Sequence, residues 1–169
     1  CLIVRGSGGQ HVTGEHSQSS VHTLVFGCGH DDLWSMTAAS VGAVLSVLAG
    51  AGQNRLLVND TVVAGTSNLN LGADDDLVQL SDSTFEQTLY VNAYAGSDRF
   101  EADGVVIQST LFLSLGDDDD VADLTDLLVG GPVVARLGGG HDAFRLRQSQ
   151  VSGNLSLTAS SGNNVIDLE

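Results

Sequence analysis

The sequence predicts an all-β protein, a right-handed parallel β-helix in which each coil has 22 residues and three short strands. Three observations support this prediction: a 22-residue repeat, apolar residues at fixed positions of that repeat, and glycine and Asx residues at fixed positions between them. A constant internal period is typical of solenoids, in which each repeat buries its apolar face against its neighbours. Parallel strands joined by crossovers coil with a right hand.

The repeat runs through the whole chain in one frame. Its copies begin at Cys1, Thr23, Leu45, Ser67, Leu89, Leu111, Val133 and Leu155. The 169 residues therefore make about 7.7 coils (169/22) of a single solenoid domain over residues 1–169. Natural solenoids close their ends with polar or helical caps. Because the frame continues to both ends here, we expect both ends to be uncapped.

Four positions of the repeat carry apolar series that predict the core. Position 3 is aliphatic in every copy, from Ile3 to Leu157, and positions 12, 14 and 19 are apolar in nearly every copy. Residues alternate at positions 1 to 5 and 11 to 15, and a short apolar run covers positions 17 to 20. We therefore expect three strands per coil. Equivalent side chains such as Val91, Leu113 and Ala135 should then lie in one column along a common axis.

The turn between the first two predicted strands also repeats. Glycine recurs at positions 6 and 8, where a turn requires positive φ or close backbone approach. Position 10 is Asx in every copy after the first, in the series Asp32, Asn54, Asp76, Asp98, Asp120, Asp142 and Asn164. One interpretation is that this side chain caps the turn by accepting hydrogen bonds from backbone N–H groups, with the other acids of the turn solvated.

A second interpretation of the acidic turns is a calcium site. Carboxylates stacked about 5 Å apart repel one another, and calcium, which takes six to eight oxygen ligands, would relieve that repulsion. The candidate ligands of this tentative calcium are Asp32, Asp74, Asp75, Asp76, Asp98, Asp118, Asp119, Asp120 and Asp142. Asparagine in the same slot, at Asn54 and Asn164, favours capping without a metal.

Composition argues against several other partners. The formal charge is −15 and lysine is absent, which disfavours nucleic acid and anionic membranes. The sequence has no apolar run long enough to insert into a bilayer. Cys1 and Cys28 would lie about 15 Å apart, too far for a disulfide. Cys1 therefore either fills a small apolar slot or carries a lipid. The histidines share no position of the repeat, which disfavours a zinc site.

The coil length resembles that of right-handed parallel β-helices of bacterial surface proteins, including adhesins and fibre-forming proteins, and of polysaccharide lyases. This resemblance implies an extracellular or cell-surface location. Two turns, GADDDLVQL at 72–80 and GGGHDAFRL at 138–146, are similar to the glycine- and aspartate-rich repeats of hemolysin-type calcium-binding proteins. That second resemblance implies bound calcium, although those proteins use nine-residue units and this chain uses 22.

Together these observations predict a non-enzymatic extracellular structural module of a fibre, filament or adhesin. Its expected partners are copies of itself, stacked end to end, or adjoining coils of a longer chain, because uncapped ends invite strand addition. A calcium-binding repeat is the alternative. A polysaccharide-acting enzyme is the remaining hypothesis and depends on Arg145 and Arg147, which share a strand face. The absence of lysine and of long loops disfavours it, so we expect no enzyme.

Overall fold

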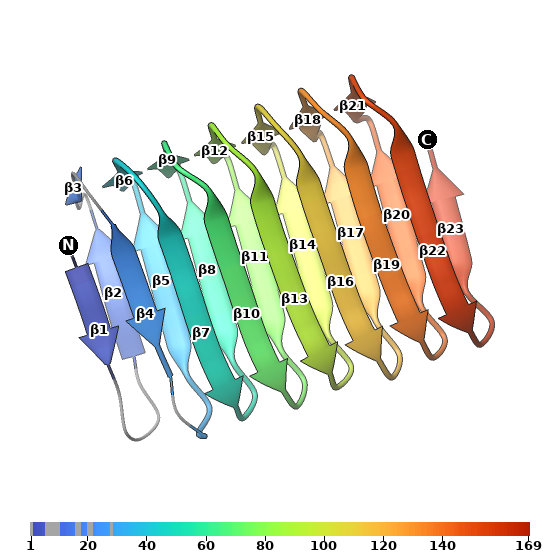
Figure 1. The fold of residues 1–169 in the computed structure, drawn as a ribbon, viewed down its shortest axis with the longest axis horizontal. Helices are drawn as coiled ribbons and strands as arrows, with labels where there is room; N and C mark the ends of the chain where they lie inside the picture. The colour runs from blue at the N-terminus through green and yellow to red at the C-terminus, as the bar shows by residue number, and fades with distance from the viewer. Residues whose placement is uncertain (1, 6–10, 16–17, 20–21, 28) are drawn as a thin grey trace.

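The computed structural model describes residues 2–5, 11–15, 18–19, 22–27 and 29–169. These residues form a β-solenoid in which three parallel sheets wrap a common axis (Figure 1). The predicted parallel β-helix is therefore confirmed. Cys1, Gln10 and Cys28 lie outside the described residues, and so do the expectations that concern them.

Each full coil adds one strand to each of the three sheets. Sheet A holds β1 (Leu2–Arg5), β4 (Thr23–Phe26), β7 (Leu45–Ala51), β10 (Ser67–Ala73), β13 (Leu89–Ala95), β16 (Leu111–Asp117), β19 (Val133–Gly139) and β22 (Leu155–Ser161). Sheet B holds β2 (His11–Glu15), β5 (Leu33–Thr37), β8 (Arg55–Asn59), β11 (Leu77–Ser81), β14 (Arg99–Asp103), β17 (Val121–Thr125), β20 (Ala143–Arg147) and β23 (Val165–Leu168). Sheet C holds β3 (Gln18–Ser19), β6 (Ser40–Val41), β9 (Val62–Val63), β12 (Thr84–Phe85), β15 (Val106–Ile107), β18 (Leu128–Val129) and β21 (Gln150–Val151). Within the described residues, no helix is long and apolar enough to cross a membrane.

Equivalent residues of neighbouring coils pair directly. Val91 pairs with Leu113, and Leu113 pairs with Ala135, so the predicted column exists. In Figure 1 the strands of sheet A run down the near side and those of sheet B run back up behind them, while the chain advances from the N-terminus towards the C-terminus. This sense of winding is right-handed, as predicted.

Most strands of sheet A are longer than the repeat pattern indicates, and those of sheet C are shorter. From β7 to β19, sheet A pairs through position 7 of the coil, because the residue at position 6 adopts positive φ and stays in register, whereas the pairing of β19 with β22 shifts there. A Cβ atom on Gly72 would lie 1.7 Å from the carbonyl oxygen of Gly50 in the preceding coil, so a side chain there has no room. Sheet C keeps only positions 18 and 19.

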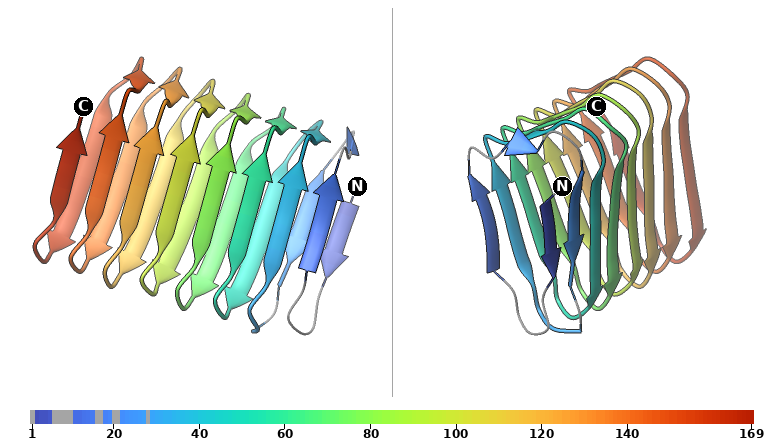
Figure 2. Two further views of the ribbon diagram at one scale, coloured as in Figure 1. Left: turned by 180° about the vertical axis from the view of Figure 1, so that it is seen from behind. Right: turned by 60° about the vertical axis from the view of Figure 1, so that its left-hand side comes forward.

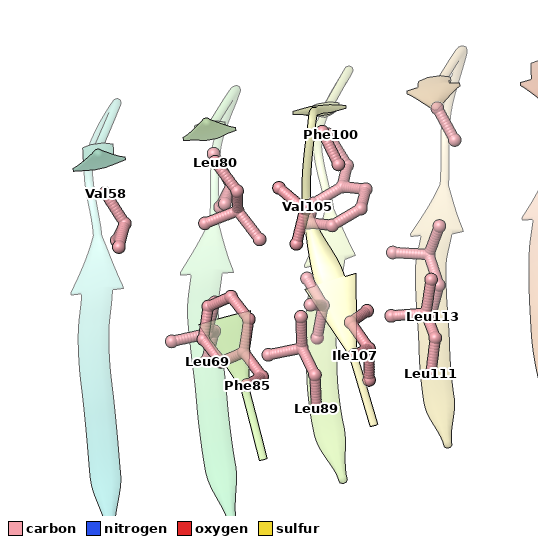
Figure 3. Close-up of a cluster of buried hydrophobic side chains, with 14 of the residues drawn as sticks. Val58, Leu69, Leu80, Phe85, Leu89, Phe100, Val105, Ile107, Leu111 and Leu113 are labelled. Carbon is pink, nitrogen blue, oxygen red and sulfur yellow. The ribbon is translucent and has the colours of Figure 1, made fainter. Parts of the chain in front are cut away.

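The core is a continuous apolar column between the sheets (Figure 3). The four predicted apolar positions are buried in the central coils, as at Val91, Phe100, Leu124 and Ile107. Positions 1 and 5, which lie outside the four apolar series, are buried as well. They include Leu45, Ala49, Leu89, Ala93, Leu111, Leu115, Val133 and Leu137. Each buried aliphatic side chain contributes about 1.5–3 kcal/mol relative to exposure, so more side chains stabilise a coil than the four ladders predict.

Candidate functional site

The turns that join sheet A to sheet B line one edge of the solenoid (Figure 2). Along this edge, the position-10 side chains form a column that we call the Asx ladder: Asp32, Asn54, Asp76, Asp98, Asp120, Asp142 and Asn164. From Asn54 onward, each Oδ1 atom accepts a hydrogen bond from the backbone N–H of the ladder residue one coil earlier, at 2.6–3.2 Å. The capping interpretation therefore holds, with the difference that the bond accepted by Oδ1 comes from the preceding coil and so bridges two coils.

The aspartates of the Asx ladder are buried, whereas the other acids of these turns are exposed. The second carboxylate oxygen, Oδ2, is buried without a hydrogen-bond partner in Asp76, Asp98, Asp120 and Asp142. In the same slot, the Nδ2 amide of Asn54 donates to the carbonyl oxygen of Gly52 at 2.7 Å. An asparagine thus satisfies both ends of its amide here, whereas an ionised aspartate has no proton to donate.

Burial shifts the proton equilibrium of these carboxyls. It raises the pKa of Asp76 to about 7, although the hydrogen bond from the Asn54 amide lowers it, and the charge of Asp98 raises it further. Burial likewise raises the pKa of Asp120 to about 7 and that of Asp98 to about 6. The pKa of Asp142 is also raised, first by burial. Near neutral pH, Asp76 and Asp120 therefore carry a proton in part of the molecules.

The remaining turn acids are exposed, and several of them bond to neighbouring coils. Asp74 Oδ2 accepts from the Gly52 amide at 2.9 Å, and Asp75 Oδ1 accepts from the Ser97 amide at 2.9 Å. Asp119 Oδ1 accepts from the His141 amide at 2.7 Å. Asp118 has positive φ at the bend itself. These bonds tie consecutive turns together along the edge.

Within the described ranges, no three His, Cys, Asp or Glu side chains gather closely enough to hold a metal ion. The nine predicted calcium ligands are instead divided between the buried Asx ladder and the exposed turn surface. Calcium binding stays a prediction, and its best support is the set of unpartnered Oδ2 atoms of Asp76, Asp98, Asp120 and Asp142.

The outer face of sheet B carries a polar groove of about 640 Å³. A chain of hydrogen bonds crosses it, because Arg55 donates to Gln79 at 2.9 Å and Gln79 donates to Glu101. Arg145 lies 3.8 Å from Asp123, and Arg147 lies 2.6 Å from Asp167. The two arginines of the enzyme hypothesis therefore lie on one face as expected, each beside a carboxylate.

The C-terminal coil differs from the coils before it in the exposure of its core positions. Ile166 is 49% exposed, whereas Phe144, one coil earlier at the same position, is 0% exposed. Leu168 is 53% exposed, compared with 8% for Leu146. The free edges of β22 and β23 lie beside these side chains. This end presents both an apolar surface and unpaired backbone groups.

The scan against protein-family models found no match for the chain, and the searches of curated proteins and of solved structures found none either.

The structure shows two features that the apolar series of the repeat did not indicate. A second column of hydroxyl groups, at position 17, includes Thr61, Ser83 and Ser149. Its signal in the sequence was weak, because Val105 and Leu127 interrupt it. The second feature is Tyr94, an aromatic residue at position 6, where Gly50, Gly72, Gly116 and Gly138 stand in neighbouring coils. This departure from the glycine row was visible in the sequence.

Proposed function

We propose that this protein is a non-enzymatic structural module of an extracellular fibre, filament or adhesin. In this proposal another coil of the same 22-residue design covers the C-terminal coil. The observation that supports it most directly is the exposure of Ile166 and Leu168 in slots that are buried one coil earlier. The extracellular location rests on the resemblance of the coil to those of bacterial surface β-helices.

The chemistry of the exposed end fits a second coil better than it fits a globular partner. The edges of sheets A and B present unpaired N–H and C=O groups at the parallel-strand spacing, which a further strand pairs directly. Covering Ile166 and Leu168 would contribute about 1.5–3 kcal/mol per side chain. The covering coil comes from a second copy, stacked end to end, or from adjoining coils of a longer chain.

Electron microscopy and sedimentation of the purified 169-residue protein test self-stacking. We expect rods longer than one molecule for the wild type and shorter particles for Ile166→Asp, which places a charge in the contact. The matched control is Val62→Asp, because Val62 is 42% exposed on the lateral face of sheet C and faces no stacked coil. Dispersed wild-type monomers in all buffers, calcium included, would remove the self-stacking version.

Calcium binding is the second candidate, favoured by the buried, unpartnered Oδ2 atoms of Asp76, Asp98, Asp120 and Asp142. A cation beside this column would offset carboxylate repulsion and would raise the melting temperature. Calorimetry with calcium should then give heat that is reduced in Asp120→Asn, which removes one charge at the centre of the column. No heat and no melting shift on adding calcium would eliminate this candidate.

A further inference from the structure

Tyr94 occupies a backbone slot that the fold otherwise gives to glycine. Its φ is 83°, close to the 95° of Gly50 and the 92° of Gly138 at the same position. Most other non-glycine residues with positive φ are aspartates at tight bends. Aspartate tolerates that region through local hydrogen bonds, whereas a bulky aromatic residue does not. Glycine at position 94 would adopt this φ without the strain.

Core packing does not explain the tyrosine. Its side chain is 57% exposed on the outer face of sheet A. The phenol hydroxyl donates to Oδ1 of Asn70 at 3.3 Å, an oxygen that also accepts from Asn92 at 3.0 Å. The ring is therefore held in place at the surface although it adds little to the core. A strained residue that does not stabilise its own fold indicates a binding role.

Tyr94 lines one end of a hollow of about 390 Å³ that runs across four adjacent strands of sheet A, β13, β16, β19 and β22. Four strands at the usual spacing span about 14 Å. Gly116 and Gly138 lie beneath the hollow and leave its floor bare. A Cβ atom on Gly138 would lie 1.6 Å from the Gly116 carbonyl oxygen, so a side chain there would force the backbone to shift.

The polar groups around the hollow include both hydrogen-bond donors and acceptors. Asp117 offers carboxylate oxygens, Arg136 offers guanidinium donors, and Ser114, Thr158 and Ser160 offer hydroxyls that do both. Within the described residues, no ion pair involves Asp117 or Arg136. Their hydrogen-bonding groups therefore remain available to a ligand that is rich in hydroxyl groups.

We propose that this hollow binds a neutral oligosaccharide, with one sugar ring stacked on Tyr94. A sugar ring presents an apolar C–H face to an aromatic ring and hydroxyls at its rim to Asp117, Arg136 and Thr158. The chain's net charge of −15 disfavours an acidic polymer. The site lies on the side of the solenoid, so stacking at the ends leaves it open. Sugar binding at this site therefore does not depend on end-to-end stacking of the protein.

Binding of linear trisaccharides of glucose, mannose, galactose and N-acetylglucosamine tests the proposal. Saturation-transfer NMR reports contact, and calorimetry reports affinity. We expect at least one trisaccharide to bind with Kd of about 1 mM or tighter. Tyr94→Gly should weaken that binding at least about tenfold, which is about 1.4 kcal/mol. Tyr90→Ser is the matched control, because it removes an exposed tyrosine of the same strand outside the hollow and installs the residue found at Ser46 and Ser156.

The Tyr94→Gly variant also separates binding from folding. Because it restores the glycine of the neighbouring coils, we expect its melting temperature to equal or exceed that of the wild type. Three results would overturn the proposal: no trisaccharide binds the wild type, the variant binds as tightly as the wild type, or the variant melts at a lower temperature. The last result would assign the ring a structural role.

Discussion

The two bends on either side of sheet B stabilise the coil with different side chains that make the same pair of hydrogen bonds. At the bend before sheet B, Asn54 accepts from the Asp32 amide and donates to the Gly52 carbonyl. At the bend after sheet B, Ser83 accepts from the Thr61 amide and donates to the Ser81 carbonyl. In both cases the side chain connects two coils and closes its own turn.

The difference between the bends is the source of the donated proton. A serine or threonine hydroxyl carries its proton at every accessible pH, and so does the asparagine amide. The aspartates that fill most of the Asx ladder carry one only when they are neutral. Asp76 shows the consequence: Oδ1 accepts from the Asn54 amide, and Oδ2 is left buried without a partner. The hydroxyl bend is thus insensitive to pH, whereas the Asx bend responds to it.

The largest expected effect is that mild acid stabilises the fold. Because the pKa values of Asp76 and Asp120 in the folded state, about 7, lie above the ordinary value of 3.8, the folded state binds more protons than the unfolded state between these limits. The stabilisation is complete below about pH 4 and is lost as the pH rises through 6 to 7. One pKa unit corresponds to about 1.4 kcal/mol, so several carboxyls together change the free energy of unfolding by several kcal/mol.

Urea unfolding at about pH 4.5, 6 and 8, at constant ionic strength, measures this dependence. Asp98 and Asp142, whose pKa values are also raised, act in the same direction. Glu101 acts in the opposite direction: burial alone would raise its pKa, but hydrogen bonds from Gln79 and Arg99 lower it overall. A free energy of unfolding that rises with pH across this window would contradict the protonated ladder.

The second prediction converts one member of the Asx ladder into the form found at Asn54. Asp120→Asn keeps the acceptor for the Asp98 amide and supplies a permanent donor in place of the unpartnered Oδ2. We expect the variant to be more stable than the wild type by about 1–2 kcal/mol near pH 8 and unchanged near pH 4.5. The measurement is the difference between the two urea midpoints at each pH.

The reverse change provides the control for that prediction. Asn54→Asp should introduce a further pH-dependent carboxyl and destabilise the protein near pH 8 only. If Asp120→Asn destabilises the protein equally at both pH values, the carboxylate has a different partner from the one inferred here. A calcium-dependent loss of stability in Asp120→Asn would favour the metal in place of the proton.

The repeat pattern predicted the fold because the period alone places residues 22 apart on top of one another. The column of Val91, Leu113 and Ala135 needed no further information, and the cross-coil register follows from it. The pattern could not show which turn acids face inward. Asp75 and Asp76 are adjacent in sequence, yet one is exposed and the other is buried, because the bend turns the chain between them. The sequence pattern therefore could not reveal that one carboxylate oxygen of Asp76 lacks a partner.

The hollow beside Tyr94 shows a different limit. The glycine row at position 6 was recognised as a turn requirement, and Tyr94 appeared only as a gap in it. The positive φ, the exposed ring and the bare floor at Gly116 and Gly138 exist only in three dimensions. Averaging over repeats identifies what the coils share, and this hollow depends on a residue that they do not share.

The smallest expected effect tests the hydroxyl bend. Ser83→Ala removes the acceptor of the buried Thr61 amide and the donor to the Ser81 carbonyl, which should cost about 1 kcal/mol. Because no proton is gained or lost, the cost should be the same near pH 4.5 and near pH 8. Ser81→Ala is the control: its hydroxyl donates to Asn59 at the surface, so its cost should stay within about 0.5 kcal/mol. The effect of Ser83→Ala on stability could instead vary with pH as much as the effect of Asp120→Asn does. That result would show that the two bends are coupled and that the contrast between them does not arise within each side chain alone.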